Sequence, residues 1–189
     1  MTRKHVSYLA TVLVLLAGLP ALAGGHATPA SRCARLADAG RWKEARRTCR
    51  AEAEQGDPVA QYRLGLMYAE GRGVEKDPAR AYRWIRRAAD RGLADALFRL
   101  GVMYARGEGT PRSGAAAADR FYRAGLAYLA DGRRDEALRC VEEIRRAVRN
   151  GDLDVPNDFL AGRLLSRLYP AEEKPGRQEK AGGKARKHH

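Results

Sequence analysis

The chain has 189 residues but only four histidines, which all lie near its ends (His5, His26, His188 and His189). The long middle of the sequence therefore has no imidazole, the side chain that most often serves as a general base or a metal ligand. The motifs Cys-x-x-Cys, His-Glu-x-x-His and Ser-x-x-Lys do not occur, and neither Gly-x-Gly pair has the third glycine of a dinucleotide-binding loop. We therefore expect no metal, no cofactor and no catalytic residue.

Uncharged apolar runs are rare as well, and the one at the N-terminus has a recognisable pattern. Val6 to Leu19 carries no charge, follows the basic residues Arg3 and Lys4, and precedes the small-x-small sequence Ala21-Leu22-Ala23. The run is shorter than the roughly 20 residues of a membrane-spanning helix and is typical of a secretory signal. We expect cleavage after Ala23, no membrane-spanning segment afterwards, and a periplasmic or secreted protein. An uncleaved N-terminal anchor is the alternative.

The middle of the chain contains an internal repeat. Residues 60–73 (AQYRLGLMYAEGRG) recur 36 positions later as residues 96–109 (ALFRLGVMYARGEG). The apolar residues of each copy share one helix face, and Gly65 and Gly101 lack a side chain where a neighbouring helix would press close. Each Gly-x-Gly pair suits a loop of positive φ after the helix.

The residues around the repeat predict further helices. Asp57-Pro58 and Asp77-Pro78 each place a capping side chain before a proline at the first helical position. The second helix of the first copy is expected from about 78 to 91. Its counterpart is expected near Ser113, one residue later than a strict period, with Phe121-Tyr122 in the places of Trp84-Ile85. Further helices are predicted over 31–39, 42–55, 134–149 and 157–169, with Leu36, Trp42 and Ala45 facing inward. The total is eight helices in four antiparallel pairs, with no strand.

Residues 57–92 closely resemble the SEL-one-like repeat, a relative of the tetratricopeptide repeat (TPR), through the pattern Leu64-Gly65-x-Met67-Tyr68-x-x-Gly71-x-Gly73 and the following Ala81, Trp84 and Ala88. The resemblance implies an all-α right-handed superhelix, or solenoid, of about four hairpins that binds proteins or peptides. In exported bacterial members it implies envelope scaffolding, or control of a signalling or polysaccharide system. It implies no shared catalytic residue. The expected divisions are a signal peptide (1–23), an N-terminal capping hairpin (24–56), a SEL-one-like repeat (57–92), a second repeat with a degenerate second helix (93–130), TPR-like C-terminal capping helices (131–169) and a disordered basic tail (170–189).

The first helix of each pair is expected to line the concave side of such a stack. Beside the core stripe this helix carries Tyr62, Arg63 and Leu66 in the first copy and Phe98, Arg99 and Val102 in the second. Two aromatic residues and two arginines in register would form a groove for an acidic, carboxylate-bearing segment. Replacing Tyr62 and Phe98 by Ala is then expected to abolish partner capture without unfolding. The alternative is that both aromatics are partly core and that the arginines are a solvated face.

Cysteine is scarce too, with three in the chain. Cys33 and Cys49 lie equally far from Arg41, so an antiparallel hairpin would place them at the same height on facing helices. Export would supply an oxidising compartment, and we expect a disulfide that stabilises the terminal hairpin by about 3 kcal/mol. Two buried, reduced cysteines are the alternative. Cys140 is expected to be buried on helix 134–149, with its role left open.

The net charge of +13 favours anionic partners. Because the expected signal directs the chain away from nucleic acid, acidic proteins, envelope polysaccharide and anionic lipid headgroups are better candidates. The leading interpretation is an exported adaptor that holds a protein or peptide on its concave face. One alternative is a penicillin-binding or β-lactamase-like enzyme, since some exported members of the family are reported to bind penicillin. Those members carry a cysteine pair in each repeat, whereas this chain offers one pair. A nonspecific polyanion binder is the other alternative.

Overall fold

The computed structural model describes residues 31–150 and 158–170. The expected signal peptide (1–23) and almost all of the expected basic tail lie outside these residues. The described part of the chain forms α2 (Arg32–Asp38), α3 (Trp42–Glu54), α4 (Pro58–Glu70), α5 (Pro78–Asp90), α6 (Ala94–Arg106), α7 (Gly114–Ala130), α8 (Arg134–Arg149) and α9 (Asp158–Leu168). It contains eight helices and no strand, which confirms the predicted all-α class.

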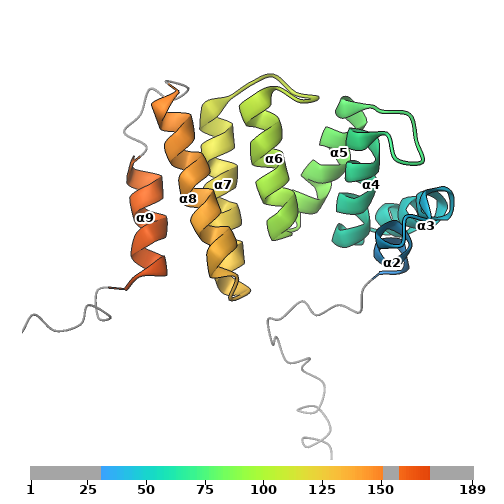
Figure 1. Ribbon diagram of the computed structural model, residues 1–189, viewed down its shortest axis with the longest axis horizontal. Coiled ribbons are helices and arrows are strands. Elements are labelled where there is room, and N and C mark those ends of the chain that lie inside the picture. The colour runs from blue at the N-terminus through green and yellow to red at the C-terminus, as the bar shows by residue number, and fades with distance from the viewer. Residues whose placement is uncertain (1–30, 151–157, 171–189) are drawn as a thin grey trace, which may run out of the picture.

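The helices pair into four hairpins, α2–α3, α4–α5, α6–α7 and α8–α9, stacked in one elongated row with α2 and α9 at opposite ends (Figure 1). Each helix packs against the next one along the chain. The first helices α4, α6 and α8 form one layer in front of α5 and α7 (Figure 1). The solenoid of helix hairpins expected from the sequence is therefore confirmed.

Short polar side chains cap three of the four helices of the repeats, α4, α5 and α7, whereas α6 has no side-chain cap. The carboxylate of Asp57 accepts a hydrogen bond of 2.8 Å from the backbone N–H of Ala60, and Asp77 does the same for Arg80. Ser113 caps α7 in the same way through the N–H of Ala116, at 3.2 Å. These bonds satisfy N–H groups that have no partner within the helix.

The structure corrects the register assigned to the second repeat. Ser113 caps α7 at the position that lies 36 residues after Asp77, the cap of α5, so the one-residue slip expected from the sequence does not exist. Phe121 consequently takes the place of Ile85, and Arg120 takes the place of Trp84. The sequence analysis had placed Phe121-Tyr122 against Trp84-Ile85, whereas the core position is set by the distance from the cap.

Two glycines bring the helices of each repeat hairpin into close contact. A Cβ atom built on Gly65 would lie 2.5 Å from Cγ1 of Ile85, and one built on Gly101 would lie 2.7 Å from Cε1 of Phe121. Ile85 and Phe121 are both fully buried. The expectation that Gly65 and Gly101 make room for a neighbouring helix is confirmed.

The loops after α4 and α6 connect the two helices of their own hairpins, and both contact the preceding hairpin. Gly73 has a φ of 70°, and a Cβ atom there would lie 2.8 Å from the carbonyl oxygen of Trp42. Gly109 has the same φ, and a Cβ atom there would lie 2.0 Å from the carbonyl oxygen of Pro78. Trp42 and Pro78 begin the second helices of the preceding hairpins. Each loop therefore rests its backbone on the hairpin before it.

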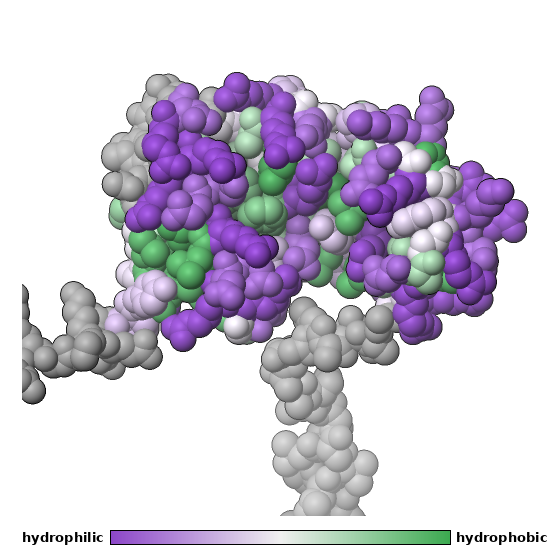
Figure 2. Space-filling model, in the orientation of Figure 1, coloured by the Kyte–Doolittle hydropathy of each residue, from purple (hydrophilic) through white to green (hydrophobic). Residues whose placement is uncertain are grey.

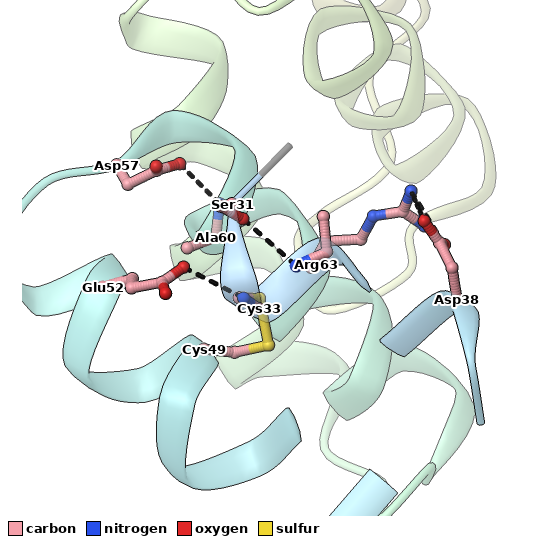
Figure 3. Close-up of a disulfide and its surroundings, with 9 residues drawn as sticks. Ser31, Cys33, Asp38, Cys49, Glu52, Asp57, Ala60 and Arg63 are labelled. Carbon is pink, nitrogen blue, oxygen red and sulfur yellow. Dashed lines mark hydrogen bonds and ion pairs between the residues drawn. A yellow bond between two sulfur atoms is a disulfide. The ribbon is translucent and has the colours of Figure 1, made fainter. Parts of the chain in front are cut away.

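The disulfide between Cys33 and Cys49 fastens α2 to α3 (Figure 3). Both cysteines are fully buried, and the backbone N–H of Cys33 donates to Glu52 at 3.1 Å. The predicted pairing is therefore confirmed. Because α2 has only seven residues and a neighbour on one side of the stack, it gains most from a covalent link.

Replacing Gly109 by Ala tests the contact between loop and hairpin. The substitution forces a side chain onto a residue of positive φ and against the Pro78 carbonyl, and we expect it to lower the free energy of unfolding by about 3 kcal/mol. Gly132→Ala is the matched control, because Gly132 has a φ of 74° but no heavy atom near its Cβ position. It should cost only about 1 kcal/mol in urea denaturation. Equal losses for the two variants would contradict the docking role of the loop.

The disulfide makes a second prediction. It closes a loop across a sequence separation of 16 residues, so reduction should lower stability by about 3 kcal/mol. Dithiothreitol should reduce the melting temperature of the native chain but leave that of the Cys33→Ser/Cys49→Ser variant unchanged. If thiol counting shows full reduction of the native chain without any fall in melting temperature, the disulfide has no stabilising role.

Candidate functional site

The surface formed by the outward sides of α2, α4, α6 and α8 is called the first-helix face here. All six residues expected to form a groove are half-buried on this face: Tyr62, Arg63 and Leu66 on α4, and Phe98, Arg99 and Val102 on α6. In Figure 2 the face is mainly hydrophilic, with one larger apolar area over the region of α8 and α9 and smaller ones between the other helices. The face therefore offers separate apolar spots within a charged surface.

A hollow of about 250 Å³ lies between α2 and α4. Arg63 and Leu66 line it together with residues that the sequence did not assign to a site, chiefly Trp42 and Arg72. The guanidinium of Arg72 lies 5.0 Å from the centre of the Trp42 ring. Trp42 is half-buried rather than a full core residue, so the capping hairpin contributes an aromatic surface to this hollow.

A second hollow, of about 290 Å³, lies between α6 and α8. Phe98 and Val102 line it, and the Phe98 ring lies 5.3 Å from the ring of the buried Phe121. The rest of the lining includes three arginines and one carboxylate, from Arg106, Arg112, Arg146 and Glu143. This hollow combines an apolar floor with a net positive rim.

Tyr62 lies outside both hollows, near Asp95, Arg63 and Arg99. Burial raises the pKa of Tyr62 above its ordinary value, and the negative charge of Asp95 adds to this rise. The phenol therefore stays neutral at physiological pH. The structure thus divides the six expected residues into a pair in each hollow, with Tyr62 and Arg99 outside them.

Both arginines expected to attract an acidic partner already have ion-pair partners within the chain. Arg63 lies 3.0 Å from Asp38 of α2, a pair visible in Figure 3, and Arg99 lies 3.0 Å from Glu108. An incoming carboxylate would have to replace Asp38 or Glu108. Since partly exposed ion pairs are worth roughly 0–1 kcal/mol, such an exchange costs little.

Tyr62 and Phe98 also pack against the main apolar core. The Ala substitutions suggested by the sequence would remove this packing, so loss of binding in that variant would be mixed with loss of stability. This favours the alternative that both aromatics are partly core. Variants of exposed rim residues separate binding from folding more cleanly.

Asp95 of α6, Tyr128 of α7 and Arg133, which precedes α8, form a polar network. Asp95 accepts a hydrogen bond of 2.9 Å from the Tyr128 hydroxyl and bonds of 3.2 and 3.3 Å from Arg133. Arg133 also stacks 4.5 Å over the Tyr128 ring. Burial and then Asp95 raise the pKa of Tyr128, and the hydrogen bond to Asp95 is the largest cause of the raised pKa of Arg133. Sequence reasoning did not find this network, because the partners of Asp95 are distant from it in the chain.

The remaining cysteine offers no reactive group. Cys140 is fully buried in α8, as expected, and burial raises the pKa of its thiol to about 12. A thiol with this pKa is protonated at neutral pH and is a poor nucleophile. Across residues 31–150 and 158–170, no group of three or more metal-ligating side chains occurs, and no helix there is long and apolar enough to span a membrane.

Comparison with known families finds one repeat family that matches this architecture. Residues 58–93 and 94–127 match the family model of the Sel1 repeat. The chain therefore carries two Sel1 repeats, formed by α4–α5 and by α6 with most of α7. Sel1 repeats generally serve as protein-interaction scaffolds and are typically non-enzymatic.

Two solved structures similar to this chain are a Sel1 repeat protein and a protein with an SLR fold. A Sel1 repeat protein from Oxalobacter formigenes shares 29% identity over 64% of this chain and 54% of its own, with a TM-score of 0.47. A protective antigen of uropathogenic Escherichia coli strains that displays an SLR fold shares 25% identity over 75% of this chain and 31% of its own, with a TM-score of 0.44. The chain thus spans about half of the first protein and under a third of the second. The comparison with curated proteins gives no match.

The network at Asp95 predicts a measurable stability effect. Tyr128→Phe removes one hydrogen bond to a carboxylate that is partly exposed, and we expect a loss of about 1 kcal/mol in the free energy of unfolding. Tyr122→Phe is the control, because the Tyr122 hydroxyl has no hydrogen bond among the described residues and should change stability by under about 0.5 kcal/mol. Identical denaturation midpoints for the Tyr128→Phe variant and the native chain would show that the network carries no net stability.

Proposed function

We propose that this protein is an exported scaffold that holds an acidic segment of a partner protein on its first-helix face. The hollow between α6 and α8 carries the proposal, because apolar side chains line its floor and arginines outnumber acids around it. A segment with an apolar side chain between carboxylates would suit this hollow, because the apolar side chain would contact the floor and the carboxylates would contact the arginines. Aromatic and arginine side chains contribute most to binding energy at protein interfaces.

The hollow between α2 and α4 supports a longer contact on the same face. Its lining pairs two arginines, Arg63 and Arg72, with two acids, Asp38 and Glu70, so its charge is balanced. The Trp42 ring and Leu66 give it apolar surface. A partner segment that extends along the row would make its acidic contacts near α6 and α8 and mainly apolar contacts near α2.

Two further observations support export. The N-terminal sequence has the pattern of a signal peptide, with Ala21-Leu22-Ala23 as the expected cleavage site. The disulfide between Cys33 and Cys49 is of a kind that persists in oxidising compartments. The proposed location is periplasmic or extracellular, and the proposed wider role is to organise an envelope signalling or polysaccharide system.

Site-specific crosslinking tests the proposed face in cells that produce the protein. A photoreactive amino acid at Val102, beside the α6–α8 hollow, should crosslink to a partner protein through an acidic segment. The same amino acid at Arg123, which is exposed on the second helix α7, should give little product. Crosslinking of equal strength from both positions would contradict a specific face.

Charge reversal identifies the contribution of the arginines. Arg106→Glu/Arg146→Glu changes two exposed rim residues, and we expect at least a tenfold loss of the product formed from Val102. Arg86→Glu/Arg123→Glu makes the same change in net charge away from the hollow and should alter the yield less than twofold. Equal losses in both variants, together with products that disappear at moderate salt whatever the ligand, would indicate a nonspecific polyanion binder.

A further inference from the structure

A separate pocket of about 430 Å³ lies where α3, α4 and α5 meet. None of its lining residues belongs to either hollow of the first-helix face. Four arginines and two aromatic residues supply most of the lining: Arg50, Tyr68, Arg80, Arg83, Trp84 and Arg87. The pocket is therefore strongly cationic and not merely a gap between apolar side chains.

The carboxylates near the pocket balance only part of this charge. Arg50 pairs with Glu54 at 3.0 Å, and Arg80 pairs with Asp77 at 3.0 Å. Asp77 is also occupied as the cap of α5. Within the described part of the chain, neither Arg83 nor Arg87 has a carboxylate partner. Two acids thus face four guanidinium groups around one pocket.

The aromatic rings hold two of the guanidinium groups in place. Arg87 lies 4.6 Å from the centre of the Trp84 ring, and Arg80 lies 5.7 Å from the centre of the Tyr68 ring. Cation–π contacts of this kind restrict a long side chain without neutralising its charge. The rings therefore position two of the four guanidinium groups, and that of Arg87 has no carboxylate partner among the described residues.

The number of donors indicates the class of ligand. Each guanidinium offers five N–H donors in a planar fork, so four of them exceed what the two oxygens of one carboxylate can accept. A phosphate group has three acceptor oxygens and carries up to two negative charges near neutral pH. We propose that the pocket formed by Arg50, Arg80, Arg83 and Arg87 binds the phosphate group of a soluble phosphorylated molecule.

A direct binding measurement on the full chain tests this site. Inorganic phosphate is the probe, titrated calorimetrically with acetate as the carboxylate control. We expect saturable binding of phosphate that acetate at the same concentration does not displace. Failure of phosphate to bind, or equal competition by acetate, would overturn the assignment.

Paired substitutions locate the site. Arg83→Gln/Arg87→Gln removes the two guanidinium groups that lack acid partners and should weaken phosphate binding at least tenfold. Arg86→Gln/Arg123→Gln makes the same charge change on exposed residues outside the pocket and should weaken it less than twofold. Similar weakening by both variants would show that phosphate responds to diffuse charge and would refute the pocket.

Vesicles distinguish a soluble ligand from a membrane surface. Binding to phosphatidylcholine vesicles that contain phosphatidic acid, with no binding of free phosphate, would overturn the soluble-ligand proposal in favour of a lipid headgroup. The Arg83→Gln/Arg87→Gln variant should still crosslink from Val102, because that hollow is lined by other residues. Failure of the phosphate site and failure of the partner-binding face are therefore distinguishable.

Discussion

The close approach of the two helices within each Sel1 hairpin is the contact on which the rest of the structure depends. Gly65 and Gly101 allow Ile85 and Phe121 to occupy the space where a Cβ atom would stand. This contact fixes the rotation of α4 and α6 about their own axes. The rotation of a helix determines the direction of every side chain on it. The same contact therefore sets which residues reach the first-helix face.

Stacking between hairpins depends on a second backbone contact, made by the loops. Gly73 and Gly109 place loop backbone against the first residues of α3 and α5, so the hairpins α4–α5 and α6–α7 are each positioned by the one before. In such arrays each repeat is stabilised by contacts with its neighbours and not by one central core. The terminal hairpin α2–α3 lacks a preceding neighbour, and its disulfide supplies part of the missing constraint.

Charge is distributed unevenly over this scaffold. Most arginines on the first-helix face have carboxylate partners, as Arg63 and Arg99 do, which lowers the cost of placing cations beside half-buried aromatic rings. The pocket between α3, α4 and α5 differs, because Arg83 and Arg87 have no carboxylate partner among the described residues, and Arg87 stacks on Trp84. The charges of the first-helix face are thus mostly paired, whereas the pocket has more arginines than acids.

Sequence alone determined the helical class, the repeat, the caps at Asp57 and Asp77, and the pairing of Cys33 with Cys49. These features are local or periodic, so residue type and spacing are sufficient to find them. Sequence reasoning placed the start of α7 correctly near Ser113 but assigned it a one-residue slip in register, with Phe121-Tyr122 in the places of Trp84-Ile85. Counting from the cap at Ser113 would have found the correct register.

Only the tertiary structure decided which side chains meet across hairpins. Trp42 with Arg72, Asp95 with Tyr128 and Arg133, and the arginines around Trp84 come together because helices from different parts of the chain pack side by side. It also showed that Tyr62 and Phe98 are half-buried and pack partly against the core. This partial burial depends on the rotation of the neighbouring helices. Periodicity predicts which face of a helix is apolar, whereas the depth of each residue is set by the side chains packed against it.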